Sequence, residues 1–313
     1  LLNRMGALQF STATFRTDEP ALNAWFSPAS DHIITADARG DISIWSPTER
    51  DPLLQFEVAD SSSYLARPSA AGALVVMSEF GDTGVWDAAT GEQLAELELG
   101  VLGVADFAVS ADGHKIATAS LFGDVQVWDA ATGDELVALV GHEDIMHSIA
   151  FSPDDQALVT TSSDGTARVW DASTGEQRLV LTHTDGHSGD SRAAFSPDSR
   201  FVATLSTAAV VRIWDAMTGK QVNQFTFPDE NARLNFGEFV GLAFSADGRY
   251  LVTSGAENGL DVSVWEVASG TRVLTLENHR AEINSAGFSP DALHVVTTSQ
   301  DGTAQTWDLR FLD

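Results

Sequence analysis

A short pattern that ends in tryptophan returns along the chain and constrains the fold more than any other sequence feature. Its clearest copy is Gly165-Thr-Ala-Arg-Val-Trp-Asp171. With its six relatives, the pattern is centred on Trp45, Trp86, Trp128, Trp170, Trp214, Trp265 and Trp307. Successive tryptophans are 41, 42, 42, 44, 51 and 42 residues apart. This period accommodates four short strands with their turns, so the sequence predicts an array of β units.

Each unit reads as four strands separated by tight turns. Between residues 146 and 183, apolar and polar residues alternate over four short runs, which Ser-Pro-Asp-Asp, Ser-Asp-Gly and Thr-Gly turns separate. No stretch has a sustained helical stripe. A four-stranded sheet exposes both of its faces, and seven such sheets can cover each other by stacking around an axis. The sequence therefore predicts an all-β, seven-bladed β-propeller of four-stranded antiparallel blades, forming one domain over residues 1–313.

The repeats resemble those of the WD-repeat (WD40) family over residues 7–308. The resemblance rests on the period, the Trp-Asp endings and the Gly-His pairs Gly141-His142 and Gly186-His187. Only five residues follow Asp308, too few for the outer strand that the other units carry. We expect Ala7-Leu-Gln-Phe10 to complete the last blade, a closure that is usual in the family.

The resemblance also implies a structural tetrad, in which histidine, serine or threonine, aspartate and the tryptophan N–H form a chain of hydrogen bonds. Two blades contain the full set: His142, Thr160, Asp164 and Trp170 in blade four, and His279, Thr297, Asp301 and Trp307 in blade seven. The same residue types could form a nucleophile triad, but the repetition and expected burial favour architecture. Blade five has His187, Thr204 and Trp214 with Ala208 in place of the aspartate. The other blades carry Arg39, Phe80, Phe122 and Gly259 there.

Composition narrows the range of partners. The chain has 45 acidic and 17 basic residues, a formal net charge of −28, which would repel nucleic acid and anionic membranes. This surplus suits a solvated surface, adapted to a salty environment, or a patch for a basic partner. No transmembrane run or signal peptide is visible, which favours a soluble, cytoplasmic protein. Leu1 is not an initiator methionine, which leaves open a longer protein with a leader.

Catalytic and ligand-binding signals are weak. Cysteine is absent, which excludes disulfides, thiolate metal sites and a cysteine nucleophile. His183 and His187, with Asp185 and Asp190 nearby, have a spacing that metals can use, but the segment reads as a polar loop. Phosphate-binding and nucleophile-elbow motifs are absent from the sequence. We therefore expect no catalytic, cofactor or metal residues.

We interpret the chain as a non-catalytic protein-interaction scaffold within a larger protein or assembly, whose partner is a protein or peptide. The resemblance implies binding on the narrow face, where the loops that join blades lie with the turns before each tryptophan strand. Seven extra residues lengthen one such loop between Gly219 and Phe244. The predicted partner-binding residues are Leu121, Ile145, His147, Ser163, Arg233, Leu234, Phe236, Val240, Asn258, Glu282, Asn284 and Gln300.

Two alternatives remain open at this point. One is a propeller that binds a small molecule or metal, with or without enzymatic activity, through its central channel or the loop with His183 and His187. An inner channel lined by histidines and carboxylates would favour this reading. The other is a sensor module of a bacterial kinase or nucleotide hydrolase, which residues before Leu1 would reveal.

Overall fold

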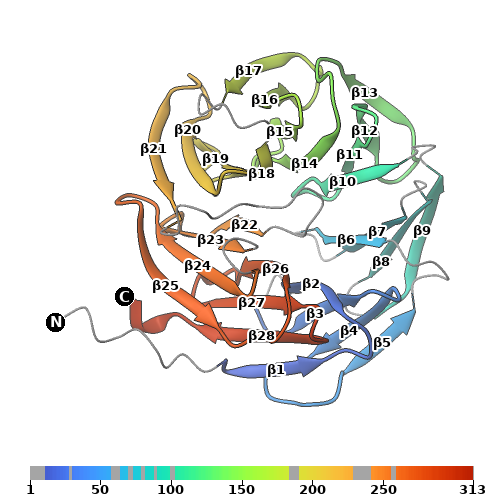
Figure 1. Cartoon of the computed structure of the whole chain (residues 1–313). Helices are drawn as coiled ribbons and strands as arrows, with labels where there is room; N and C mark the ends of the chain where they lie inside the picture. The colour runs from blue at the N-terminus through green and yellow to red at the C-terminus, as the bar shows by residue number, and fades with distance from the viewer. Residues whose placement is uncertain are drawn as a thin grey trace.

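The computed structural model of the chain describes residues 11–27, 30–57, 64–69, 73–78, 82–87, 90–98, 103–182, 190–227, 241–254 and 259–312. These residues form an all-β structure without α-helices, and a 3-10 turn, η2 (Arg310–Leu312), follows the last strand. The strands surround a central axis as a β-propeller (Figure 1), which confirms the predicted fold class at that level. No helix in these segments has the length and apolar character to cross a membrane.

The described strands pair into seven four-stranded antiparallel sheets, which we number in chain order. Within each sheet, the strands are given below from the innermost to the outermost. Sheets one to three are β2 (Ala21–Phe26), β3 (Ile33–Asp37), β4 (Asp41–Trp45), β5 (Leu54–Glu57); β6 (Tyr64–Pro68), β7 (Ala73–Ser78), β8 (Asp82–Asp87), β9 (Gln93–Glu98); and β10 (Val104–Val109), β11 (Lys115–Ser120), β12 (Val125–Asp129), β13 (Glu135–Leu139). Sheets four and five are β14 (Met146–Phe151), β15 (Ala157–Ser162), β16 (Thr166–Asp171), β17 (Gln177–Thr182); and β18 (Asp190–Phe195), β19 (Phe201–Ser206), β20 (Val210–Asp215), β21 (Gln221–Thr226). Sheets six and seven are β22 (Leu242–Phe244), β23 (Tyr250–Ser254), β24 (Asp261–Glu266), β25 (Thr271–Glu277); and β26 (Ile283–Phe288), β27 (His294–Ser299), β28 (Thr303–Asp308), β1 (Ala13–Arg16).

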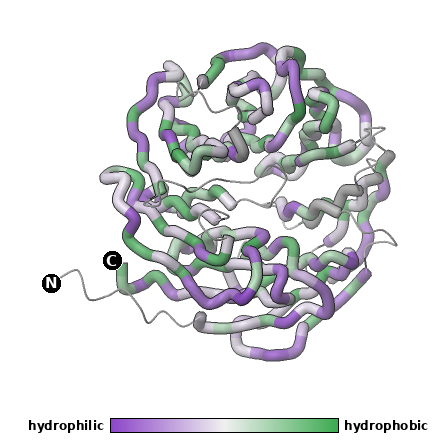
Figure 2. Tube along the Cα trace, in the orientation of Figure 1, coloured by the Kyte–Doolittle hydropathy of each residue, from purple (hydrophilic) through white to green (hydrophobic). Residues whose placement is uncertain are grey.

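The apolar core lies between consecutive sheets. Between sheets three and four, for example, Ala117 and Val127 of one sheet pack with Met146, Leu158 and Trp170 of the next. Trp170 is fully buried there, and the other repeat tryptophans likewise pack at the interface with the preceding sheet. Figure 2 shows apolar residues distributed over all the sheets rather than gathered in one place. Burial of a residue of this size contributes several kcal/mol, and cohesion is therefore spread around the propeller.

The N-terminal strand completes the last sheet, but it is Ala13–Arg16 and not the predicted Ala7–Phe10, which lies outside the described residues. Strand β1 pairs antiparallel with β28, with Ala13 opposite Thr306 and Arg16 opposite Thr303. Phe15 is 1% exposed, and its ring lies 5.5 Å from that of Trp45 in sheet one. Phe15 therefore anchors β1 at the interface between sheets seven and one.

Candidate functional site

The full tetrad of sheet four is assembled as a continuous chain of hydrogen bonds. His142 Nδ1 lies 2.7 Å from Asp164 Oδ2, and His142 Nε2 lies 2.7 Å from Thr160 Oγ1. The indole N–H of Trp170 donates to the same hydroxyl at 2.8 Å. The turn between β15 and β16 holds the aspartate in place, because Asp164 Oδ1 also accepts from the backbone N–H and the hydroxyl of Thr166.

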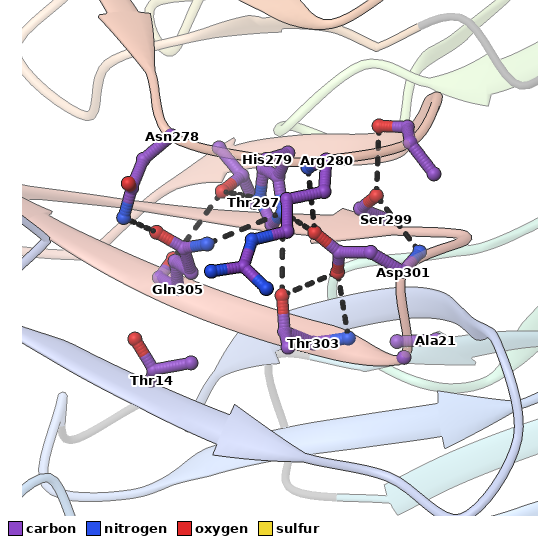
Figure 3. Close-up of polar contacts among 12 residues, drawn as sticks. Thr14, Ala21, Asn278, His279, Arg280, Thr297, Ser299, Asp301, Thr303 and Gln305 are labelled. Atoms are coloured by element: carbon purple, nitrogen blue, oxygen red, sulfur yellow. Dashed lines mark hydrogen bonds and ion pairs between the residues drawn. The ribbon is translucent and has the colours of Figure 1, made fainter.

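The tetrad of sheet seven repeats this geometry with a looser first contact (Figure 3). His279 Nδ1 lies 3.3 Å from Asp301 Oδ2, and its Nε2 lies 2.8 Å from Thr297 Oγ1. Trp307 donates to Thr297 at 3.0 Å. Gln305 adds a contact that sheet four lacks, because its amide lies 3.3 Å from His279 Nδ1.

Burial decides what the tetrads can do chemically. Thr160 and Thr297 are fully buried, and each hydroxyl already meets both an imidazole and an indole N–H. Burial, which disfavours the charged imidazolium, lowers the pKa of His142 and His279 despite the neighbouring aspartates. A substrate cannot reach these hydroxyls, so the nucleophile reading does not fit, and the networks tie strands together within each sheet.

Four of the sheets without a full tetrad keep its hydrogen bond between tryptophan and threonine. The tryptophans of sheets one, three, five and six donate to a threonine hydroxyl at 2.8 to 2.9 Å, in the pairs Trp45 with Thr35, Trp128 with Thr118, Trp214 with Thr204 and Trp265 with Thr253. Trp86 is the exception, since its buried Nε1 has no partner among the described residues. Valine stands at position 76, where the other sheets have threonine, and it offers no hydroxyl. This regularity was not predicted, although the threonines precede their tryptophans by 10 residues in sheets one, three and five and by 12 in sheet six.

Several predicted partner-binding residues lie on loops and turns of the face that we call the narrow face, and their role in binding stays a prediction. Leu121 and Ile145 are 48% and 44% exposed. His147 Nε2 lies 2.7 Å from Ser163 Oγ, so these two form a polar pair beside Ile145. Glu282 and Gln300 are exposed and contact each other, with Gln300 Nε2 donating to Glu282 Oε2 at 3.3 Å.

Asn284 is wrongly predicted as a partner-binding residue. Its side chain is buried, and its Nδ2 donates to the carbonyl of Ala21 at 2.8 Å. This bond joins sheet seven to sheet one. A β-bulge between Ile283 and Ser285 breaks the alternation of side chains and turns Asn284 toward its neighbour.

Other predicted positions fall outside the described residues. They are Arg233, Leu234, Phe236, Val240 and Asn258 of the partner-binding set, and His183, Asp185 and His187 of the candidate metal loop. The loop between sheets five and six, which carries the first four, therefore stays a prediction.

The narrow face has an exposed apolar patch that includes Phe122, a residue outside the predicted partner-binding set. Phe122 is 76% exposed and lies beside Leu121. The same turn lies close to the segment that carries Ile145. A Cβ atom added to Gly123 would be 3.4 Å from the carbonyl oxygen of Asp144, the residue before Ile145. We call Leu121, Phe122 and Ile145 the narrow-face patch. The exposed carboxylates of Asp124, Glu143 and Asp144 border it.

The innermost strands carry a buried charge cluster that the sequence did not reveal. Asp106 on β10 is 2% exposed and accepts from Arg67 Nη2 at 2.8 Å and Arg192 Nη1 at 2.7 Å. Its Oδ2 also accepts from the backbone of Ile149 at 3.3 Å. Burial lowers the pKa of Arg67, although Asp106 opposes that shift. Because its partners come from sheets two, four and five, Asp106 links four sheets near the axis.

Comparison with known proteins adds independent information. The family model described as "WD domain, G-beta repeat" matches residues 133–171, 178–215 and 270–308. The Lissencephaly-1 homolog 1 of Paramecium tetraurelia is 32% identical over 50 residues, which is 16% of this chain and 12% of that protein. Transcription initiation factor TFIID subunit 5 of Caenorhabditis elegans is 36% identical over 58 residues, 18% of this chain and 9% of that protein. Eukaryotic translation initiation factor 3 subunit I of Nematostella vectensis is 32% identical over 83 residues, 26% of this chain and 24% of that protein. These matches span a quarter or less of each relative.

Proposed function

Because this chain belongs to the WD-repeat family, we propose that it is a protein-interaction scaffold without catalytic activity of its own. Two of its relatives are named as subunits of multi-subunit initiation factors, TFIID and translation initiation factor 3. Those names describe the relatives, and they support an assembly role for a similar propeller. The buried threonines of both tetrads also suit a scaffold better than an enzyme.

The scaffold is one closed seven-bladed ring and a single domain over residues 1–313. Its support is the contact between the two ends of the chain, where β1 extends sheet seven and sheet seven meets sheet one. Asn284 donates to Ala21, and Ser285 Oγ accepts from the backbone N–H of Ala24 at 3.3 Å. Closure of this kind leaves only short sheet edges and gives a rigid platform.

The narrow-face patch is the observation that carries the proposal. Leu121, Phe122 and Ile145 expose apolar surface on adjoining turns of sheets three and four. Exposed apolar groups that gather within a polar rim are typical of protein-binding surfaces, and aromatic residues dominate their binding energy. Arg233, Leu234 and Phe236 are proposed to extend this surface from the loop between sheets five and six.

Charge defines the class of partner. Asp124, Glu143 and Asp144 border the patch, and the whole chain carries a formal charge of −28. A protein or peptide with apolar side chains flanked by lysine or arginine complements this surface, and a nucleic acid does not. Association should therefore be faster at low salt.

The test compares two pairs of exposed apolar residues on different surfaces of the protein. F122S/I145S changes the narrow-face patch, and L136S/V222S changes exposed apolar residues on the outer strands β13 and β21. A partner isolated with the wild-type protein should bind the first variant at least about tenfold more weakly and the second unchanged. Circular dichroism should show both variants folded. Loss of binding with L136S/V222S alone would place the interface on the outer circumference instead.

A further inference from the structure

A repeated turn on the face opposite the narrow face joins neighbouring sheets in different ways. In sheets four, five and seven the turn reads Ser-Pro-Asp and then a residue with positive φ: Asp155 at 57°, Ser199 at 58° and Ala292 at 60°. This last residue points back toward the matching turn of the preceding sheet. Its identity decides what fills the space between the two turns.

The junction between sheets three and four shows this space filled by a carboxylate. Asp155 Oδ1 accepts from the backbone N–H of Ala111 at 2.7 Å, and Oδ2 accepts from that of Asp112 at 3.0 Å. Both donors belong to a Ser-Ala-Asp-Gly turn in sheet three. Two consecutive N–H groups thus bind one carboxylate through both of its oxygens, a strong charge-assisted arrangement.

The junction between sheets four and five has a weaker form of the same contact. Pro153 replaces the first donor, since proline has no N–H. The remaining N–H, that of Asp154, donates to Ser199 Oγ at 3.3 Å. At both junctions, the side chain of the residue with positive φ therefore accepts the hydrogen bonds that the preceding turn can donate.

The junction between sheets six and seven breaks this match. Sheet six has the same Ser-Ala-Asp-Gly turn as sheet three, with Ala246 and Asp247 in the places of Ala111 and Asp112. The residue opposite is Ala292, which has no side-chain acceptor. Among the described residues, nothing accepts a hydrogen bond from the N–H of Ala246 or Asp247.

A cavity of about 320 Å³ lies at this junction, between the turns of sheets six and seven. Ala246, Asp247 and Ala292 line it together with an apolar wall, formed by Tyr250, Pro290, Leu293 and Leu309. This volume is at the small end of the range for ligand sites, about 300 to 1,000 Å³. Two residues whose N–H groups have no acceptor among the described residues thus line the same cavity as an apolar wall.

The two aspartates at the cavity do not argue against an anion. Asp247 Oδ1 already accepts from Ser245 Oγ and the backbone of Arg249, and Asp291 Oδ1 accepts from Ser289 Oγ and the backbone of Leu293. The equivalent residues at the filled junction, Asp112 and Asp154, make the same turn contacts while the Asp155 carboxylate is bound beside them.

We propose that this cavity binds a small carboxylic acid with a short apolar chain. The N–H groups of Ala246 and Asp247 hold its two oxygens as those of Ala111 and Asp112 hold Asp155. Its hydrocarbon chain packs against Tyr250, Leu293 and Leu309. The site is independent of the narrow-face patch and goes beyond the proposed scaffold role.

The test uses butyrate as the probe and its uncharged analogue butyramide as the control. In ligand-observed NMR at constant ionic strength, butyrate should show saturable binding and butyramide should not. Chloride and sulfate at the same ionic strength should not compete. Equal competition by sulfate would mean that the site selects charge alone, which contradicts a carboxylate site.

Two variants locate the binding. A292D supplies the missing carboxylate, and aspartate tolerates positive φ better than alanine, so this protein should fold and lose butyrate binding. A246P removes one donor but keeps a turn that sheets four, five and seven already use, and it should weaken binding at least about tenfold. Undiminished binding in both variants would overturn the proposal.

The filled junction provides a reciprocal test. D155A removes the native carboxylate and should lower the melting temperature, and butyrate should restore part of that loss where butyramide does not. If D155A gains no response to butyrate, the paired N–H groups do not recognise free carboxylates.

Discussion

Single residues decide how each sheet satisfies its buried polar groups. Six repeat tryptophans donate to a threonine hydroxyl, whereas the buried Nε1 of Trp86 has no partner in the described part of the chain. A buried donor without an acceptor costs about 1–3 kcal/mol. The absence of a hydroxyl at position 76 therefore lowers the stability of sheet two, and a substitution that restores the hydroxyl is a direct test.

V76T should raise the free energy of unfolding by about 1 kcal/mol, because the new hydroxyl can accept from Trp86. Urea denaturation measures the change. V159T is the control, since Val159 is fully buried in sheet four and its replacement would bury a hydroxyl that the sheet does not need. Equal destabilisation by both substitutions would show that the Trp86 N–H gains nothing from V76T.

The tetrad histidines give stability a pH dependence of known sign. Burial lowers the pKa of His142 and His279, so the folded protein binds fewer protons than the unfolded chain just below about pH 6.5. The contribution of the two histidines to the free energy of unfolding is complete above about pH 6.5. It is lost as the pH falls from there through their lowered pKa values in the folded protein. Urea denaturation from pH 7 to 5 should show this decline.

H142Q/H279Q should flatten the decline, although His147, whose pKa burial also lowers, retains part of it. A slope unchanged by the double substitution would assign the acid sensitivity to other groups.

At the scale of elements, the period and alternation were enough to predict the strands, and the resemblance to the WD-repeat family predicted both full tetrads. The closing strand was misplaced because Ala7–Phe10 and Ala13–Arg16 both alternate. Spacing could have separated them. Phe15 precedes Phe26 by 11 residues, close to the 12 that separate Leu139 from Phe151 and Leu276 from Phe288. Asn284 could not be placed from the sequence, because a bulge depends on the pairing of whole strands.

Strand β1 should be essential for stability. F15A removes a buried ring from the interface between sheets seven and one and should cost about 3–5 kcal/mol. T14A, on the exposed neighbouring position, should change stability by less than about 0.5 kcal/mol. Thermal unfolding and light scattering measure both variants, and aggregation is expected for F15A as the edge of β28 opens. An F15A protein as stable as T14A would contradict closure by β1.

For the molecule as a whole, charge is the dominant feature that the sequence alone supplies. A formal net charge of −28 favours self-repulsion in the folded state, which salt screens. The melting temperature should therefore rise from dilute buffer to molar sodium chloride. A flat or falling curve would mean that the acidic surplus has no effect on stability. The apolar patch needed the structure, because Phe122 and Ile145 are far apart in the sequence and meet only when sheets three and four adjoin.

Hydrogen–deuterium exchange of the protein with and without a bound partner tests the scaffold account most directly. Backbone amides at residues 120–124 and 142–147 should exchange more slowly in the complex, because the narrow-face patch is covered. The outer strands β13, β17 and β21 should exchange at the same rate in both samples. Protection confined to those outer strands, with none at the patch, would contradict binding on the narrow face.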